Sequence, residues 1–181
     1  MTSQTKHQKR RPYVSLAGAA VLTAGLTLVL GAGAATAAER PGEAGWAAVV
    51  KPALNCPQPK TRAAWNVVRA RVAAVGDLTG DGGRETVVVS SCPSPTASNP
   101  LIAFVYDGAA KPSNPRLLGA LGKNRYFKSL KVTVRGGRVH LHGKALSDAA
   151  PRCCPDLVVS QTYRWDGKKL RRTAETVSRA R

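Results

Sequence analysis

The residues best suited to chemistry are the oxygen-bearing side chains of one Gly-rich segment, GDLTGDGGRETVVV. Asp77, Thr79, Asp81 and Glu85 stand at positions 1, 3, 5 and 9 of a loop that begins at Asp77. Alternate side chains in a tight turn converge on one point, and the carbonyl oxygen of Gly83 would complete a cage for a hard cation that prefers oxygen ligands. The spacing therefore predicts a calcium site made by these five residues.

A plain turn is the alternative explanation of the same residues. Asp side chains often accept hydrogen bonds from nearby backbone N–H groups, and glycine permits the sharp backbone reversal. The sequence leaves both interpretations open.

The segment resembles the calcium loop of FG-GAP and VCBS-type β-propeller repeats, in which D-x-[DN]-x-D-G-x-x-[DE] precedes a Val-rich strand. Thr79 stands where that pattern has Asn or Asp, and this departure removes a good ligand. The motif occurs once, whereas a propeller needs at least about four blades. The resemblance therefore implies the loop and its calcium ion, and not the propeller.

Four cysteines, Cys56, Cys92, Cys153 and Cys154, predict disulfides if the chain is exported. Three pairings are possible. A bond between the adjacent Cys153 and Cys154 is disfavoured by geometry, but it would leave Cys56 free to pair with Cys92. We favour Cys56–Cys92, because that bond would pin the N-terminal arm to the end of a strand.

Other catalytic and metal-binding patterns are weak. His140 and His142 lie two apart on an expected strand and so share a face. With Cys153 and Cys154 they could form a zinc site, but an exported chain favours disulfides over thiolate ligands. The chain has no G-x-S-x-G, H-E-x-x-H or phosphate-loop motif. We therefore expect a protein that is not an enzyme.

The elements that must position these residues are short strands. β-branched runs bounded by Gly and Pro predict a mainly β fold, a single antiparallel domain of six to eight strands over residues 63–181. The clearest hairpin turns at Gly136-Gly137, and a second turns at Asp166-Gly167. A helix over residues 62–74 is the alternative to the first strand, because Ala and Arg favour helices.

Two N-terminal segments precede this domain. Residues 1–37 predict a signal peptide, with a basic start, an uncharged run over residues 14–30 and the cleavage site Ala35-Thr36-Ala37. An uncleaved anchor is the alternative, and no membrane-spanning segment is expected after cleavage. The Pro- and Ala-rich residues 38–62 predict an irregular arm, whose apolar residues 46–50 could dock onto the domain.

The charge is large and uneven. The chain has a net charge of +18, and residues 111–181 hold 17 basic and 4 acidic groups. A basic half of this kind predicts an anionic partner, either a cell-wall polymer or a phospholipid surface, with an acidic protein as the alternative. Nucleic acid is not expected, because aromatic residues that could stack on bases make up only 5% of the chain.

A broader resemblance covers most of the chain after residue 37. The pieces GDLTGDGGRETVVVSSC, FVYDGAA, RLLGAL and PRCCPDLVVSQTYRWDG are similar to small secreted or lipid-anchored proteins of high-GC Gram-positive bacteria. The LppP/LprE lipoproteins are similar at the Y-x-W-D-G end. The resemblance implies a secreted protein of the cell envelope and brings no catalytic residue. We therefore expect a secreted, non-enzymatic binding module.

Overall fold

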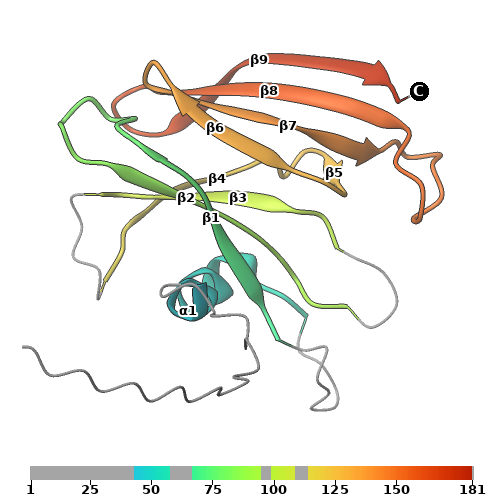
Figure 1. Ribbon diagram of the computed structural model, residues 1–181, viewed down its shortest axis with the longest axis horizontal. Coiled ribbons are helices and arrows are strands. Elements are labelled where there is room, and N and C mark those ends of the chain that lie inside the picture. Colours follow the sequence, from blue (N-terminus) through green and yellow to red (C-terminus); the bar gives the residue numbers. More distant parts are fainter. Residues whose placement is uncertain (1–42, 58–66, 95–98, 109–113, 181) are drawn as a thin grey trace, which may run out of the picture. The chain divides into compact units, whose positions relative to one another are not determined.

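The computed structural model describes residues 43–57, 67–94, 99–108 and 114–180, which contain one helix and nine strands in two antiparallel sheets (Figure 1). The first sheet has the order β1 (Arg69–Gly76), β2 (Glu85–Ser91), β3 (Ile102–Tyr106), β4 (Leu117–Leu121). In the second sheet, β5 (Tyr126–Phe127) and β6 (Lys131–Arg135) both pair with β7 (Arg138–Leu146), which is followed by β8 (Leu157–Trp165) and β9 (Leu170–Arg179). The prediction of a mainly β, antiparallel, hairpin-rich fold is confirmed.

Eight of the strands lie where the sequence pattern placed them. The ninth is β5, whose two residues are too few to show any periodicity. The alternative of a helix over residues 62–74 is wrong where the structure describes it, because residues 69–76 form β1. Gly136 and Gly137 have φ values of 56° and 65°, which the tight turn between β6 and β7 requires.

The arm is not irregular, because Glu43–Leu54 form the helix α1. Its prolines suggested an extended segment, yet Pro52 lies inside the last turns of the helix. The helix is stabilised by packing: Val50 is fully buried, and the Trp46 and Tyr106 ring centroids are 5.2 Å apart. The expected docking of residues 46–50 onto the domain is confirmed. The signal peptide and the remaining residues of the arm, 38–42 and 58–62, lie outside the described residues.

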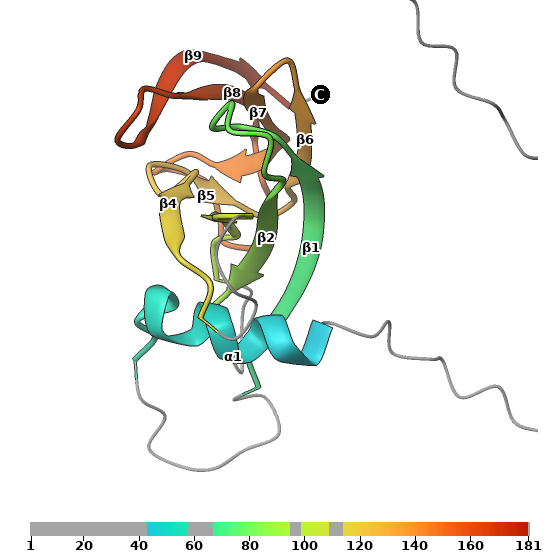
Figure 2. The same ribbon diagram turned by 90° about the vertical axis from the view of Figure 1, so that its left-hand side faces the viewer.

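The first sheet is the middle layer, with α1 on one side and the second sheet on the other (Figure 2). Val88 and Phe104 face the helix, whereas Val87, Val89 and Val105 face the second sheet. This double burial explains why β2 contains three consecutive valines rather than an alternating pattern.

The second sheet is buried on one face only. Along β7, Val139, Leu141 and Ala145 are buried in the core between the sheets, and the residues between them on the other face are polar. Within the described ranges, no helix or strand lies over that outer face (Figures 1 and 2). No described helix has the length and apolar character needed to cross a membrane.

We predict that the helix contributes directly to stability. Val50→Asp places a charge in the apolar contact between α1 and the first sheet, and should lower the free energy of unfolding by at least about 3 kcal/mol. Lys51→Asp is the matched control, since Lys51 is exposed, and should change it by less than about 1 kcal/mol. Urea denaturation measures both. Equal effects would contradict the packing role assigned to α1.

Candidate functional site

The strand register of the second sheet brings four arginines into one row. Arg135 pairs with Arg138 across the first hairpin, Arg138 with Arg164, and Arg164 with Arg171. Directly paired residues of antiparallel strands point to the same face. All four side chains are exposed. The row therefore crosses the whole outer face of the sheet, from β6 to β9.

The rest of this face carries imidazoles, hydroxyls and lysines. The Nδ1 atom of His140 lies 3.1 Å from Thr162 Oγ1, and that of His142 lies 2.8 Å from Ser160 Oγ. These contacts hold the two rings against β8. Lys131 pairs with His142, and Lys144 pairs with Val158. We call the outer surface of β6–β9 the basic face, defined by Lys131, Arg135, Arg138, His140, His142, Lys144, Arg164 and Arg171.

No carboxylate occupies a paired position on this face in the described strands. Asp166 lies in the turn after β8, at the end of the arginine row, and its carboxylate bonds to Arg171. The backbone N–H groups of Lys169 and Lys168 also donate to Asp166, and together with Arg171 they hold the pKa of its carboxyl well below its usual range. Arg135, Arg138 and Arg164 form no ion pair within the described part of the chain.

The predicted calcium residues lie in the turn between β1 and β2. Asp77 accepts hydrogen bonds from the backbone N–H groups of Gly80 at 2.7 Å and Gly82 at 3.3 Å. Asp81 accepts one from Gly83 N–H at 2.8 Å. Gly80 and Gly82 have φ values of 81° and 84°, so the turn needs glycine at both positions.

Glu85 is fully buried at the start of β2 and differs from the other two carboxylates. It accepts hydrogen bonds from the backbone N–H of Leu78 at 2.6 Å and of Thr79 at 3.2 Å, and lies 3.5 Å from the Thr79 hydroxyl. The three carboxylates therefore bond to the backbone of their own turn. In the described residues, no three His, Cys, Asp or Glu side chains form a group that could hold a metal.

Calcium binding by this turn stays a prediction. If the turn binds calcium with a Kd near 0.1 mM, the free energy of unfolding should be about 2.7 kcal/mol higher in 10 mM calcium than in chelator. Asp77→Ala should abolish this difference. Identical melting of the wild-type protein in calcium and in chelator would leave the hydrogen-bonded turn as the explanation of these residues.

All four cysteines are paired. Cys56–Cys92 ties the residues after α1 to the end of β2, as predicted. Cys153–Cys154 forms the adjacent pair, in the loop between β7 and β8, so the zinc site imagined with His140 and His142 is wrong. Ser147 and Asp156 close the base of this loop, because the Ser147 N–H and hydroxyl both donate to the Asp156 carboxylate, at 2.8 and 2.7 Å.

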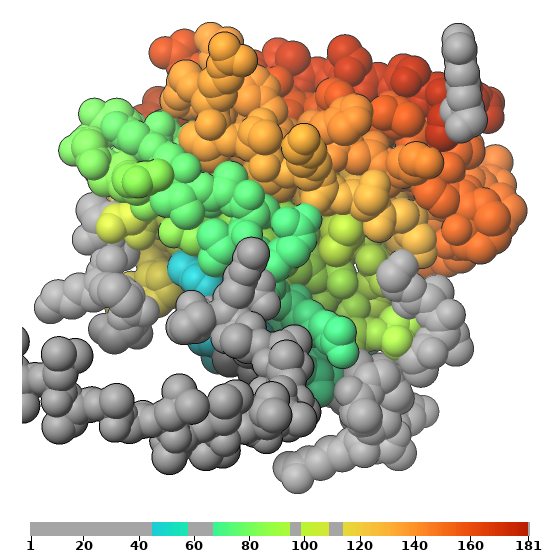
Figure 3. All heavy atoms as spheres, in the orientation of Figure 1, coloured from blue at the N-terminus to red at the C-terminus, as the bar shows by residue number. Residues whose placement is uncertain are grey.

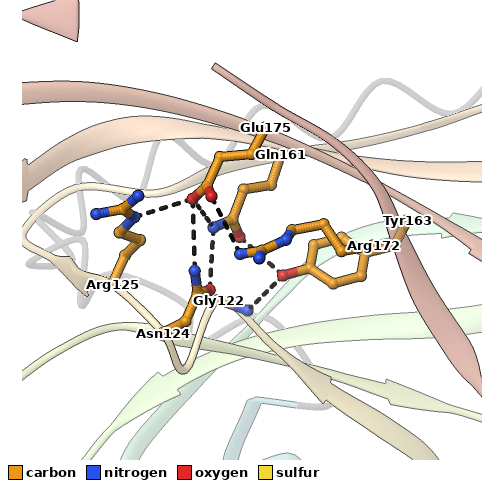
Figure 4. Close-up of polar contacts among 7 residues, drawn as sticks. All are labelled: Gly122, Asn124, Arg125, Gln161, Tyr163, Arg172 and Glu175. Atoms are coloured by element: carbon orange, nitrogen blue, oxygen red, sulfur yellow. Dashed lines mark hydrogen bonds and ion pairs between the residues drawn. The ribbon is translucent and has the colours of Figure 1, made fainter. Parts of the chain in front are cut away.

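A buried polar network joins the two sheets at the β4 and β9 side (Figure 4). Gln161 is 1% exposed, and its amide nitrogen donates to Asn124 at 3.0 Å and to Glu175 at 2.8 Å. The Tyr163 hydroxyl donates to the Gln161 carbonyl oxygen at 2.8 Å and lies 3.3 Å from Gly122 N–H, which donates to it. Every buried polar group of the network therefore has a partner.

Glu175 is the charged centre of this network. Arg125 Nε donates to one carboxylate oxygen at 2.9 Å, and Arg172 lies 3.2 Å from the other. The Arg125 hydrogen bond lowers the pKa of Glu175 to about 2. Sequence reasoning missed this network, because no short motif brings the residues after β4, which supply Asn124 and Arg125, to the hairpin of β8 and β9. The satisfied contacts indicate that it closes the edge between the sheets.

The comparisons with known proteins give no match, neither to a family model, nor to a curated protein, nor to a solved structure.

We predict that Glu175→Gln lowers the free energy of unfolding by about 1–3 kcal/mol at pH 7, because two arginines lose their carboxylate partner. The pKa of Glu175 is depressed from an ordinary value of 4.5 to about 2, so its contribution is fully present above pH 4.5 and is lost as the pH falls toward 2. The difference between wild type and variant in urea denaturation should therefore shrink over that range. A constant difference from pH 7 to pH 2.5 would contradict this assignment.

Proposed function

We propose that this protein is a secreted, non-enzymatic binding module that holds an anionic polymer or an anionic phospholipid surface of the cell envelope on its basic face. The observation that carries the proposal is the row formed by Arg135, Arg138, Arg164 and Arg171, which has no carboxylate beside it except at the Arg171 end.

The row is costly in the free protein. Like charges directly opposite each other on neighbouring strands are destabilising, and the row contains three such pairs. An anionic partner supplies the missing counter-charge, so the repulsion turns into binding energy. Charged residues scattered for solubility alone would not need to face each other on four neighbouring strands.

The spacing suits an extended ligand. Neighbouring strands lie about 4.8 Å apart, so the four arginine backbones span about 14 Å across the sheet. A guanidinium group binds phosphate or carboxylate with two parallel hydrogen bonds. A flat face with regularly spaced guanidinium groups favours a repeating anion over a small molecule enclosed in a pocket.

Independent features support the proposed secreted location. Two disulfides are typical of proteins in an oxidising compartment. The leader-like residues 1–37 support export. An acidic protein remains the second candidate partner, because the same face would attract it, and the experiment below separates the two.

We predict that Arg138→Gln/Arg164→Gln weakens binding to soluble polyphosphate, used as the probe, by at least about tenfold at low salt. The slope of log K against log salt concentration should fall by about 2, since two phosphate contacts are lost. Lys51→Gln/Arg84→Gln is the matched control, because it removes the same charge from exposed positions away from the basic face.

Both polyphosphate and purified Gram-positive cell walls should be tested with these variants. Equal loss in the two double variants would show that net charge alone drives binding. Failure of the wild-type protein to bind polyphosphate, cell walls and vesicles of anionic phospholipid would remove the proposal in favour of an acidic protein partner.

A further inference from the structure

A hollow of 550 Å³ lies where β1 of the first sheet runs beside β6 of the second. Figure 3 shows this side of the molecule, where the green atoms of β1 border the orange atoms of β6 and β7. A second, smaller hollow of 330 Å³ continues along β1 and shares Arg71 and Leu101 with the first. Together they form a groove along the seam between the sheets.

The floor of the larger hollow is apolar. Leu101, Leu130 and Val158 line it. Leu101 is held in place because its N–H donates to the Phe127 carbonyl oxygen at 3.0 Å, across the seam. Gly143 also lines the hollow, and a Cβ there would lie 1.9 Å from the Ser129 carbonyl oxygen, so only glycine lets residues 129–130 approach β7 this closely.

The rim of the hollow is cationic. Arg71, Lys131 and Lys144 line it from three different strands, and His142 lies between the two lysines. Arg71 is fixed at the seam, because its Nη2 donates to the Leu130 carbonyl oxygen at 2.5 Å. Among the residues that the structure describes, no acidic side chain lines either hollow, and these three cations form no ion pair.

An apolar floor below a cationic rim matches a ligand that has both characters. We propose that the hollow binds one acyl chain of an anionic lipid, with the phosphate or carboxylate of the lipid held by Arg71, Lys131 and Lys144. A volume of 550 Å³ is within the usual range for small-ligand sites. Each methylene group removed from water would contribute about 0.8 kcal/mol.

Charge complementarity favours a lipid over two other candidate occupants, which are a second copy of the protein and the protein's own apolar N-terminal segment. A second copy would bring another strongly basic surface, since the chain carries a net charge of +18. The apolar residues 14–30 of the chain itself carry no charge, and residues 1–37 contain no acid, so this segment leaves the rim without a counter-charge. Only an anionic amphiphile satisfies both floor and rim.

The inference goes beyond the proposed function, which needs charge alone. Lys144 is six residues along β7 from Arg138, about 20 Å at 3.3 Å per residue. The hollow and the arginine row are therefore at opposite ends of the basic face. Variants can remove either one while the other stays intact.

The experiment titrates the full chain with dodecyl phosphate below its micelle concentration, and separately with inorganic phosphate and polyphosphate. Calorimetry should show dodecyl phosphate binding at least 100-fold more tightly than inorganic phosphate. Amide NMR shifts should concentrate at residues 130–131, 143–144 and 158. Val158→Phe fills the hollow without a change of charge, and should weaken dodecyl phosphate at least tenfold and leave polyphosphate binding unchanged.

Two further variants serve as controls. Val75→Phe makes the same substitution at an exposed residue of β1 that lines neither hollow and lies off the basic face, and should leave both affinities unchanged. Arg138→Gln/Arg164→Gln should weaken polyphosphate alone. The inference is overturned if dodecyl phosphate binds no more tightly than inorganic phosphate, or if Val158→Phe and Val75→Phe weaken its binding equally. It is also overturned if the same amides shift when protein concentration is raised without lipid, since a second copy then fills the hollow.

Discussion

The structure depends on the burial of the first sheet on both of its faces. Phe104 of β3 lies under α1 and is fully buried, and its neighbours along the strand, Ala103 and Val105, are fully buried against the second sheet. Apolar burial of this kind is the dominant favourable term in folding. This burial also limits where a ligand can bind, because α1 and the second sheet cover the two faces of the first sheet. Among the described elements, the outer face of the second sheet is therefore a regular surface that no helix or strand covers.

At their edges, the layers are held together by a disulfide, hydrogen bonds and ion pairs rather than by further burial of apolar side chains. The Cys56–Cys92 bond joins the residues after α1 to the first sheet, and a disulfide restricts the unfolded chain as well as the folded one. On the opposite side, Glu175 and Gln161 join β8 and β9 to the turn after β4. The basic face thus lies on a sheet whose flank is fixed, and its side chains keep their spacing.

Local patterns predicted what is local in this chain. The Gly136-Gly137 hairpin, the Val-rich β2 and the turn at Asp77–Glu85 all lie where short motifs placed them. The helix α1 did not follow local signals, because its stability comes from Trp46 and Val50 packing on a distant sheet. Only part of the arginine row could be predicted from the sequence, because the two-residue turn at Gly136-Gly137 places Arg135 opposite Arg138. The pairing of β7 with β8 spans a loop of ten residues and leaves no pattern in the sequence.

The basic groups of the second sheet fall into two sets, one that is neutralised within the fold and one that faces outward and is available for binding. Arg125 and Arg172, which face the interior edge, share the Glu175 carboxylate, so their charges are balanced within the fold. Arg135, Arg138 and Arg164, which face outward, have no such partner among the described residues. Repulsion among them is tolerable because the apolar core on the other face of the same strands fixes their register. The core therefore holds in place an array of charges that would disperse on a flexible segment, and this preorganisation lowers the entropic cost of binding an anion.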